Sequence, residues 1–153
     1  MRLSSKYTSA WICKGFKKGG GAFNRWHITS TDISEESLPK LKTIIGRNFE
    51  YSVAFHGWTN GNNNNSICIG GSMQYDLKMQ IKTAIADVVS GSGIEVATDY
   101  EHTCPNDFNG NDRRNIVNRI SRKAVQIEQS KEAGKHYGTK IANAVAEVLG
   151  SIP

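Results

Sequence analysis

Residues 51–57 read YSVAFHG and decide the fold class of this 153-residue chain. The run from Tyr51 to Phe55 joins aromatic, β-branched and small side chains, a composition that predicts a β-strand. The strand leads directly into His56 and Gly57, and the glycine marks the turn that follows. An imidazole is therefore expected at the rim of a sheet.

Downstream of this stretch, short apolar runs alternate with helical patterns. Three runs predict strands: residues 67–69, 94–97 and 125–127. Apolar spacing predicts two helices, one capped by Ser72 and closed by Gly91 and Gly93, the other ending at Gly150. Their apolar positions are Leu77, Ile81, Ile85 and Val88 in the first helix, and Ile141, Val145 and Val148 in the second. Alternating strands and helices predict one α/β domain over residues 1–153, with a mixed, mostly parallel sheet flanked by helices.

The remaining segments give weaker patterns. Residues 7–14 and 25–31 combine aromatic and β-branched types, which predicts two further strands. Ser34 is a suitable N-cap for a helix that would end at Gly46. The apolar positions of that helix are Leu38, Leu41, Ile44 and Ile45. Residues 99–114 are mostly polar and predict a long loop.

Composition is that of a folded globular protein, with 38% hydrophobic and 22% charged residues. The formal net charge of +5 favours polyanionic partners such as an acidic polymer, nucleic acid or anionic lipid. The N-terminal residues lack the apolar core of a signal peptide, and no run approaches the ~20 residues that span a bilayer. We therefore expect a chain that is cytoplasmic at synthesis and has no membrane partner.

The three cysteines, Cys13, Cys68 and Cys104, show no CxxC spacing. Their odd number and the length of the chain argue against a disulfide framework and against a zinc ribbon. Cys13 and Cys68 lie in apolar runs, where a buried free thiol is the ordinary interpretation.

His56 and Glu128 each follow a predicted strand directly. Ligands of open α/β sheets gather beyond the carboxyl ends of the strands. Imidazole is a common zinc ligand, and a carboxylate beside a metal-bound water can serve as a general base. The pattern thus predicts a hydrolytic site. The alternatives are a hydrogen-bonded core histidine and a solvated glutamate.

Asn118 and Arg119 lie between these two residues in the sequence. A guanidinium grips a carboxylate through two parallel hydrogen bonds, and a neighbouring amide adds donors, so the pair is a candidate clamp for an anionic substrate. The alternative is a surface arginine that closes a short helix. His102 and Cys104 offer further metal donors, although a polar loop pair that binds nothing is the simpler interpretation.

Five motifs stand in an order that resembles the phage-type poly-γ-glutamate hydrolases: RWHITSTDI, YSVAFHG, CIGGS, RRNIVNR and VQIEQS. The resemblance covers nearly the whole chain. It implies a zinc-carboxypeptidase-like core that cleaves γ-glutamyl amide bonds in poly-γ-glutamate with one zinc ion. An acidic polymer as substrate agrees with the basic charge of the chain.

By the same resemblance, His56 corresponds to the third zinc ligand and Glu128 to the general base that activates the zinc-bound water. Arg119, with Asn118, corresponds to the group that holds a substrate carboxylate or steadies the developing oxyanion. His27 matches a family motif and is expected in the crevice wall, with plain strand packing as the alternative.

The family also has an HGG-x-IE motif, whose His and Glu supply the first two zinc ligands, and these 153 residues contain no copy of it. One histidine does not complete a catalytic zinc site, which takes three protein ligands. We therefore expect an N-terminally incomplete domain in which zinc occupancy and activity are open. A missing segment would expose a sheet edge, which predicts self-association.

Three functions compete. The first is a zinc-dependent hydrolase of γ-linked glutamate. Such an enzyme would either stay in the cytoplasm or be released by phage lysis. The second is a polyanion-binding module of the same fold that has lost hydrolysis. The third is a phage nucleic-acid-handling protein, which charge alone supports, so nucleic acid is the weakest of the expected partners.

Overall fold

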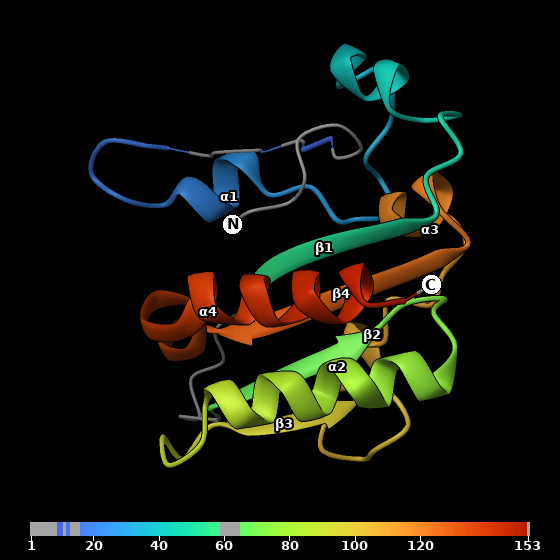
Figure 1. Cartoon of the computed structure of the whole chain (residues 1–153). Coiled ribbons are helices and arrows are strands. Elements are labelled where there is room, and N and C mark those ends of the chain that lie inside the picture. The colour runs from blue at the N-terminus through green and yellow to red at the C-terminus, as the bar shows by residue number, and fades with distance from the viewer. Residues whose placement is uncertain (1–8, 11, 13–15, 59–64, 153) are drawn as a thin grey trace.

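A mixed β-sheet organises the part of the chain that the structure, a computed structural model, describes: residues 9–10, 12, 16–58 and 65–152 (Figure 1). Its strands are β1 (Tyr51–Trp58), β2 (Ser66–Gly70), β3 (Glu95–Thr98) and β4 (Lys123–Ser130), in the order β1-β4-β2-β3. β1 runs parallel to β4 and β2 parallel to β3, whereas β2 and β4 are antiparallel. The α/β class with a mixed sheet and flanking helices is confirmed.

Two helices, α2 (Tyr75–Val88) and α4 (Lys131–Gly150), cover one face of the sheet (Figure 1). Side chains alternate along β4, so Val125 and Ile127 point to this face, and both are fully buried. The helices contribute the apolar residues that their spacing predicted, among them Ile81, Ile85, Ile141 and Val145. Ser130 is the N-cap of α4, and its Oγ accepts a hydrogen bond from the Ala133 N–H (3.2 Å).

The opposite face of the sheet is covered by the short helix α3 (Ile116–Ile120) and by the loop of residues 99–115, which contains the 3-10 turn η2 (Asn106–Phe108). This loop comes very close to β2. The Gly71 N–H donates to the Asn109 carbonyl (2.7 Å), and a Cβ on Gly70 would clash with the same carbonyl. The two glycines therefore permit a backbone approach that a larger residue would block.

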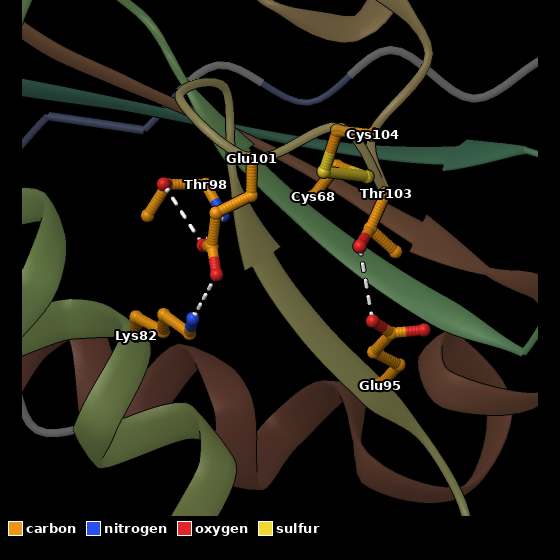
Figure 2. The surroundings of a disulfide bond; sticks show 7 residues. All are labelled: Cys68, Lys82, Glu95, Thr98, Glu101, Thr103 and Cys104. Atoms are coloured by element: carbon orange, nitrogen blue, oxygen red, sulfur yellow. Dashed lines mark hydrogen bonds and ion pairs between the residues drawn. A yellow bond between two sulfur atoms is a disulfide. The ribbon is translucent and has the colours of Figure 1, made fainter.

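A disulfide between Cys68 and Cys104 joins this loop to β2, with a Cα–Cα distance of 5.7 Å (Figure 2). The prediction of a free thiol at Cys68 is therefore wrong. The apolar run showed that the side chain is buried, but it carried no sign that a cysteine 36 residues away would meet it. Cys13 and most of the strand predicted at residues 7–14 lie outside the described residues.

Polar contacts tie the same loop to its surroundings (Figure 2). Lys82 Nζ on α2 donates to Glu101 Oε1 (2.5 Å), and Thr103 Oγ1 donates to Glu95 Oε1 on β3 (3.0 Å). Lys78 Nζ, also on α2, pairs with Asp99 Oδ2 at 2.8 Å, and both side chains are almost completely buried. The loop is thus attached to β2 by a covalent bond and to α2 by two ion pairs.

The strand predicted at residues 25–31 is wrong. Helix α1 (Ala22–Trp26) occupies its beginning, and the His27 N–H closes that helix on the Phe23 carbonyl (2.9 Å). Further along, the Ser30 carbonyl accepts from the Ile116 N–H (3.0 Å). The β-branched residues favoured a strand, but the segment pairs with α3 rather than with a sheet edge, and tertiary contacts override the propensity.

The helix predicted from Ser34 to Gly46 is a short 3-10 helix, η1 (Pro39–Thr43). Pro39 stands at its start, where the missing N–H costs nothing. Ser34 Oγ accepts from the Ser37 N–H (3.2 Å) in a preceding turn. Leu41 is fully buried, and Gly46 has a left-handed φ of 86° as its predicted terminal position requires.

Some predicted boundaries also need correction. β1 continues to Trp58 and β4 to Ser130, so His56 and Glu128 lie inside strands rather than after them. Ser72 does not cap α2. Its Oγ donates to the Arg122 carbonyl (2.9 Å), and Gln74 stands at the N-cap position.

Two expectations concern the outside of the molecule. Within the described ranges, no helix combines the length and apolar character that a membrane span needs. β1 pairs with β4 alone among the described strands, so self-association through a sheet edge stays a prediction.

Candidate active site

His56 and Glu128 stand side by side because β1 and β4 pair in register. They are direct partners in the parallel ladder, so both side chains leave the same face of the sheet, opposite α2 and α4. His56 Nδ1 lies 3.9 Å from Glu128 Oε1, which is longer than a hydrogen bond. The structure thus brings together the two residues that the sequence singled out.

Burial makes Glu128 an unusual carboxyl. The residue is 8% exposed, and burial raises the pKa of its carboxyl to about 7, partly offset by a hydrogen bond from Gln126 that favours the ionised form. Burial also lowers the pKa of His56, and the charge of His27 lowers it further. Both shifts favour the neutral forms of the carboxyl and the imidazole. Near neutral pH the two side chains are therefore in contact without forming a permanent ion pair.

A chain of buried amides ends on Glu128. Gln126 Nε2 donates to Glu128 Oε1 (2.9 Å), and Gln126 Oε1 accepts from Asn115 Nδ2 (2.6 Å). Gln126 and Asn115 are each 3% exposed. Sequence reasoning missed both. The spacing of Gln126 and Glu128 at i and i+2 of one strand was a signal for a shared face, but no pattern in the sequence connects Asn115 to them.

His27 belongs to the N-terminal segment that precedes the sheet. It follows α1 directly, is exposed, and stacks on Phe23 with ring centroids 4.3 Å apart. Its charge acts on His56, so the two imidazoles lie within electrostatic range. No strand is present at His27, which excludes the alternative of strand packing, and its place in a crevice wall stays a prediction.

Asn118 and Arg119 lie elsewhere. They belong to α3, which contacts the beginnings of β1 and β4: Ser52 Oγ donates to the Val117 carbonyl (2.7 Å). His56 and Glu128 are the sixth residues of those strands, roughly 15 Å further along at about 3.3 Å per residue. Figure 1 shows α3 at the end of the sheet where β1 and β4 begin.

Both side chains already have partners. Arg119 Nη1 donates to the Ile33 carbonyl (3.2 Å), and its Nη2 pairs with Glu35 Oε1 (2.5 Å). Asn118 Oδ1 accepts from the Ser72 N–H, and its Nδ2 donates to two backbone carbonyls. The clamp predicted from the sequence is therefore engaged with the chain itself.

Residues 1–144 match the profile of a family described as poly-gamma-glutamate hydrolase. The chain belongs to the poly-gamma-glutamate hydrolase family. Hydrolysis and an acidic polymer substrate are thereby supported at the family level. No curated protein matches the sequence. A solved structure titled "YNDL-apo (Zinc-free)" has a TM-score of 0.61 and 18% identity over 88% of this chain and 67% of its own, which shows similarity of fold alone.

The described residues of this poly-gamma-glutamate hydrolase family member do not fit a catalytic zinc ion. Such a site takes three protein ligands and one open position. Residues 9–10, 12, 16–58 and 65–152 contain no group of three His, Cys, Asp or Glu side chains close enough to hold a metal ion. Cys104 is bonded to Cys68, so it is not the additional metal donor that the sequence offered beside His102.

Proposed function

We propose that this chain hydrolyses γ-glutamyl amide bonds of poly-γ-glutamate at the His56–Glu128 pair, with Glu128 as the group that moves the proton. The observation that carries the proposal is a buried carboxyl with a pKa of about 7 beside an imidazole that is 32% exposed. A general base is most effective when its pKa lies near the working pH. An ordinary glutamate is too acidic for that role.

In the proposed reaction, a water molecule attacks the carbonyl carbon of the γ-amide. Ionised Glu128 takes one proton from the water as the C–O bond forms, and returns it to the amine nitrogen as the C–N bond breaks. His56 stays neutral near pH 7 because burial lowers its pKa, so it can hydrogen-bond the water or the carbonyl oxygen. Both groups act from one face of the sheet.

The test compares the chain length of poly-γ-glutamate before and after incubation with the wild-type protein, with Glu128→Gln and with His56→Ala. Glu147→Gln is the matched control, because Glu147 is an exposed carboxylate on α4. We expect Glu128→Gln to lower the rate by roughly 100-fold or more and Glu147→Gln to leave it unchanged. Equal rates for Glu128→Gln and the wild type would reject the proposal.

We also propose that His56 is a zinc ligand and that the sheet is a zinc-carboxypeptidase-like core. A site at His56 would need at least two ligands that the described residues do not provide. Calorimetric titration of zinc into the wild type and His56→Ala measures this directly. Binding of one ion that His56→Ala abolishes would support the ligand role, and identical titrations would remove it.

A second function has its own support. Because the described residues do not hold a three-ligand metal group, the same fold would suit a module that binds poly-γ-glutamate without cutting it. Arg119, Asn118 and His27 are the proposed contacts. A substrate carboxylate would have to replace Glu35 on the Arg119 guanidinium, since that carboxylate now occupies it.

The structure allows a sharp test of this clamp. Arg119→Ala should weaken binding of poly-γ-glutamate, whereas Glu35→Gln should strengthen it by freeing the guanidinium. Added salt should weaken binding in each case. Arg114→Ala is the control, since Arg114 pairs with Asp112 at an exposed position. If Glu35→Gln and Arg119→Ala change affinity in the same direction, Arg119 is a structural residue and not a clamp.

A further inference from the structure

The hydrogen bonds that link Asn115, Gln126 and Glu128 all run in one direction, and a backbone N–H group sets that direction. The Val117 N–H can only donate, and Asn115 Oδ1 accepts from it (3.2 Å) as the N-cap of α3. The other end of the Asn115 amide must therefore be its Nδ2. This nitrogen points to Gln126 Oε1 (2.6 Å) and to the Gly110 carbonyl (3.4 Å), and both are acceptors.

The same logic extends one step further. Because Gln126 Oε1 is held by Asn115, its Nε2 faces Glu128 Oε1 at 2.9 Å as a donor. The start of a short helix thus decides that Glu128 meets an N–H group and not a carbonyl oxygen. A carboxylate that accepts such a bond is held in one orientation, and its ionised form is favoured.

The surroundings leave Gln126 little freedom. A Cβ on Gly110 would lie 3.0–3.2 Å from Gln126 side-chain atoms, and Gly110 has a left-handed φ of 63°. A glycine is needed there on both counts. Gln126, Asn115 and Glu128 are all buried, so water does not replace these hydrogen bonds at low cost.

We propose that Asn115 and Gln126 are positioning residues that hold the Glu128 carboxylate in one orientation beside His56. The inference rests on the proposed function for its catalytic consequence, but the orientation itself is a property of the folded chain. The simpler alternative is that the amides only satisfy each other's hydrogen bonds and leave Glu128 unaffected.

Gln126→Met removes the donor and keeps the size of the side chain. Gln129→Met is a matched control: Gln129 is a buried glutamine on the same strand, adjacent to Glu128, and its side chain leaves the opposite face. Asn115→Asp is the second variant. It keeps the acceptor for the Val117 N–H but removes the donor to Gln126, so the Gln126 amide should turn toward the introduced carboxylate and leave Glu128.

The first readout is independent of activity. The ¹³C resonance of the Glu128 carboxyl, assigned by its loss in Glu128→Gln, is measured at a pH well above the pKa so that the group is ionised in every variant. We expect Gln126→Met and Asn115→Asp to shift this resonance and Gln129→Met to leave it in place. An unchanged resonance in Gln126→Met, or an equal shift in Gln129→Met, would overturn the inference.

The second readout is kinetic. Gln126→Met should lower kcat roughly 10- to 100-fold with little change in KM, because a misplaced base slows chemistry more than it weakens binding. A raised KM with unchanged kcat would show that Gln126 contacts substrate and would also overturn the inference. If the wild type does not cut the polymer but the resonance shifts as expected, hydrolysis fails and the positioning role stands.

Discussion

The two faces of the sheet are built by different means. The face under α2 and α4 is closed by apolar side chains such as Ile81, Ile127 and Ile141, all fully buried. The other face carries Glu128, Gln126 and Cys68, and it is closed by a loop that a disulfide and polar bonds hold in place. The first face is stabilised by burial of apolar surface and tolerates small movements of its side chains. The second is stabilised by individual bonds between fixed partners.

The largest expected effect comes from the buried ion pair that joins α2 to the loop of the polar face. Lys78→Met leaves the Asp99 carboxylate buried at 3% exposure without its cation, which should lower the free energy of unfolding by roughly 3–5 kcal/mol. Lys82→Met is the control, because the Lys82–Glu101 pair is 23% and 41% exposed and should contribute less than about 1 kcal/mol. Urea unfolding measures both. Equal losses would mean that burial does not distinguish the two pairs.

Reduction of the Cys68–Cys104 bond should act on the polar face alone. The bond closes a segment of 36 residues, so its loss should cost about 3–4 kcal/mol by the chain-entropy estimate. Hydrogen exchange should accelerate first in residues 99–110, before α2 and α4 respond. The Cys68→Ser/Cys104→Ser double variant should not respond to a reductant. Uniform acceleration across the sheet would show that the two faces are not separable.

The buried carboxyl of Glu128 should make stability depend on pH. Its pKa is about 7 in the folded chain against an ordinary 4.5, so the folded state keeps a proton that the unfolded state releases in that window. The free energy of unfolding should therefore fall as pH rises from about 5 to about 8, by on the order of 3 kcal/mol. His56 acts oppositely, since its lowered pKa reduces stability as pH falls below its ordinary value of 6.5.

The difference in unfolding free energy between wild type and Glu128→Gln isolates the carboxyl from other groups. We expect Glu128→Gln to gain stability relative to wild type as pH rises, while Glu147→Gln gives a flat difference. A flat difference for Glu128→Gln would mean that Glu128 titrates as an ordinary solvated carboxyl.

The smallest effect is expected at the glycine that cradles Gln126. Gly110→Ala should cost about 1–2 kcal/mol for its left-handed backbone. It should also push on the Gln126 side chain, which would lie 3.0 Å from the new Cβ. Gly91→Ala is the matched control, because Gly91 has a φ of 75° and open space around it. Gly91→Ala should lose stability through its backbone alone, so Gly110→Ala should lose at least as much, and the Glu128 resonance should change in Gly110→Ala only.

The sequence predicted the apolar face well, because helical spacing in α2 and α4 and the apolar runs of β2 and β4 report burial directly. It singled out His56 and Glu128 but expected them directly after their strands, whereas both lie inside strands that pair with each other. Residues 25–31 were assigned wrongly, since strand propensity shows what a segment prefers and not whether an edge is available. The Cys68–Cys104 bond joins positions 36 residues apart and the Asn115–Gln126 contact positions 11 residues apart, and no local pattern reports either contact.

His56 and Glu128 lie on strands that differ in how firmly the sheet holds them. β4 is hydrogen-bonded on both sides, to β1 and to β2, whereas β1 has one partner among the described strands. Amide protons of β4 should thus exchange only when the whole sheet opens, and those of β1 should exchange through fraying of that edge. His56 therefore lies on the strand that opens more easily. On heating, β1 should detach from the sheet and separate His56 from Glu128 while β4 is still folded.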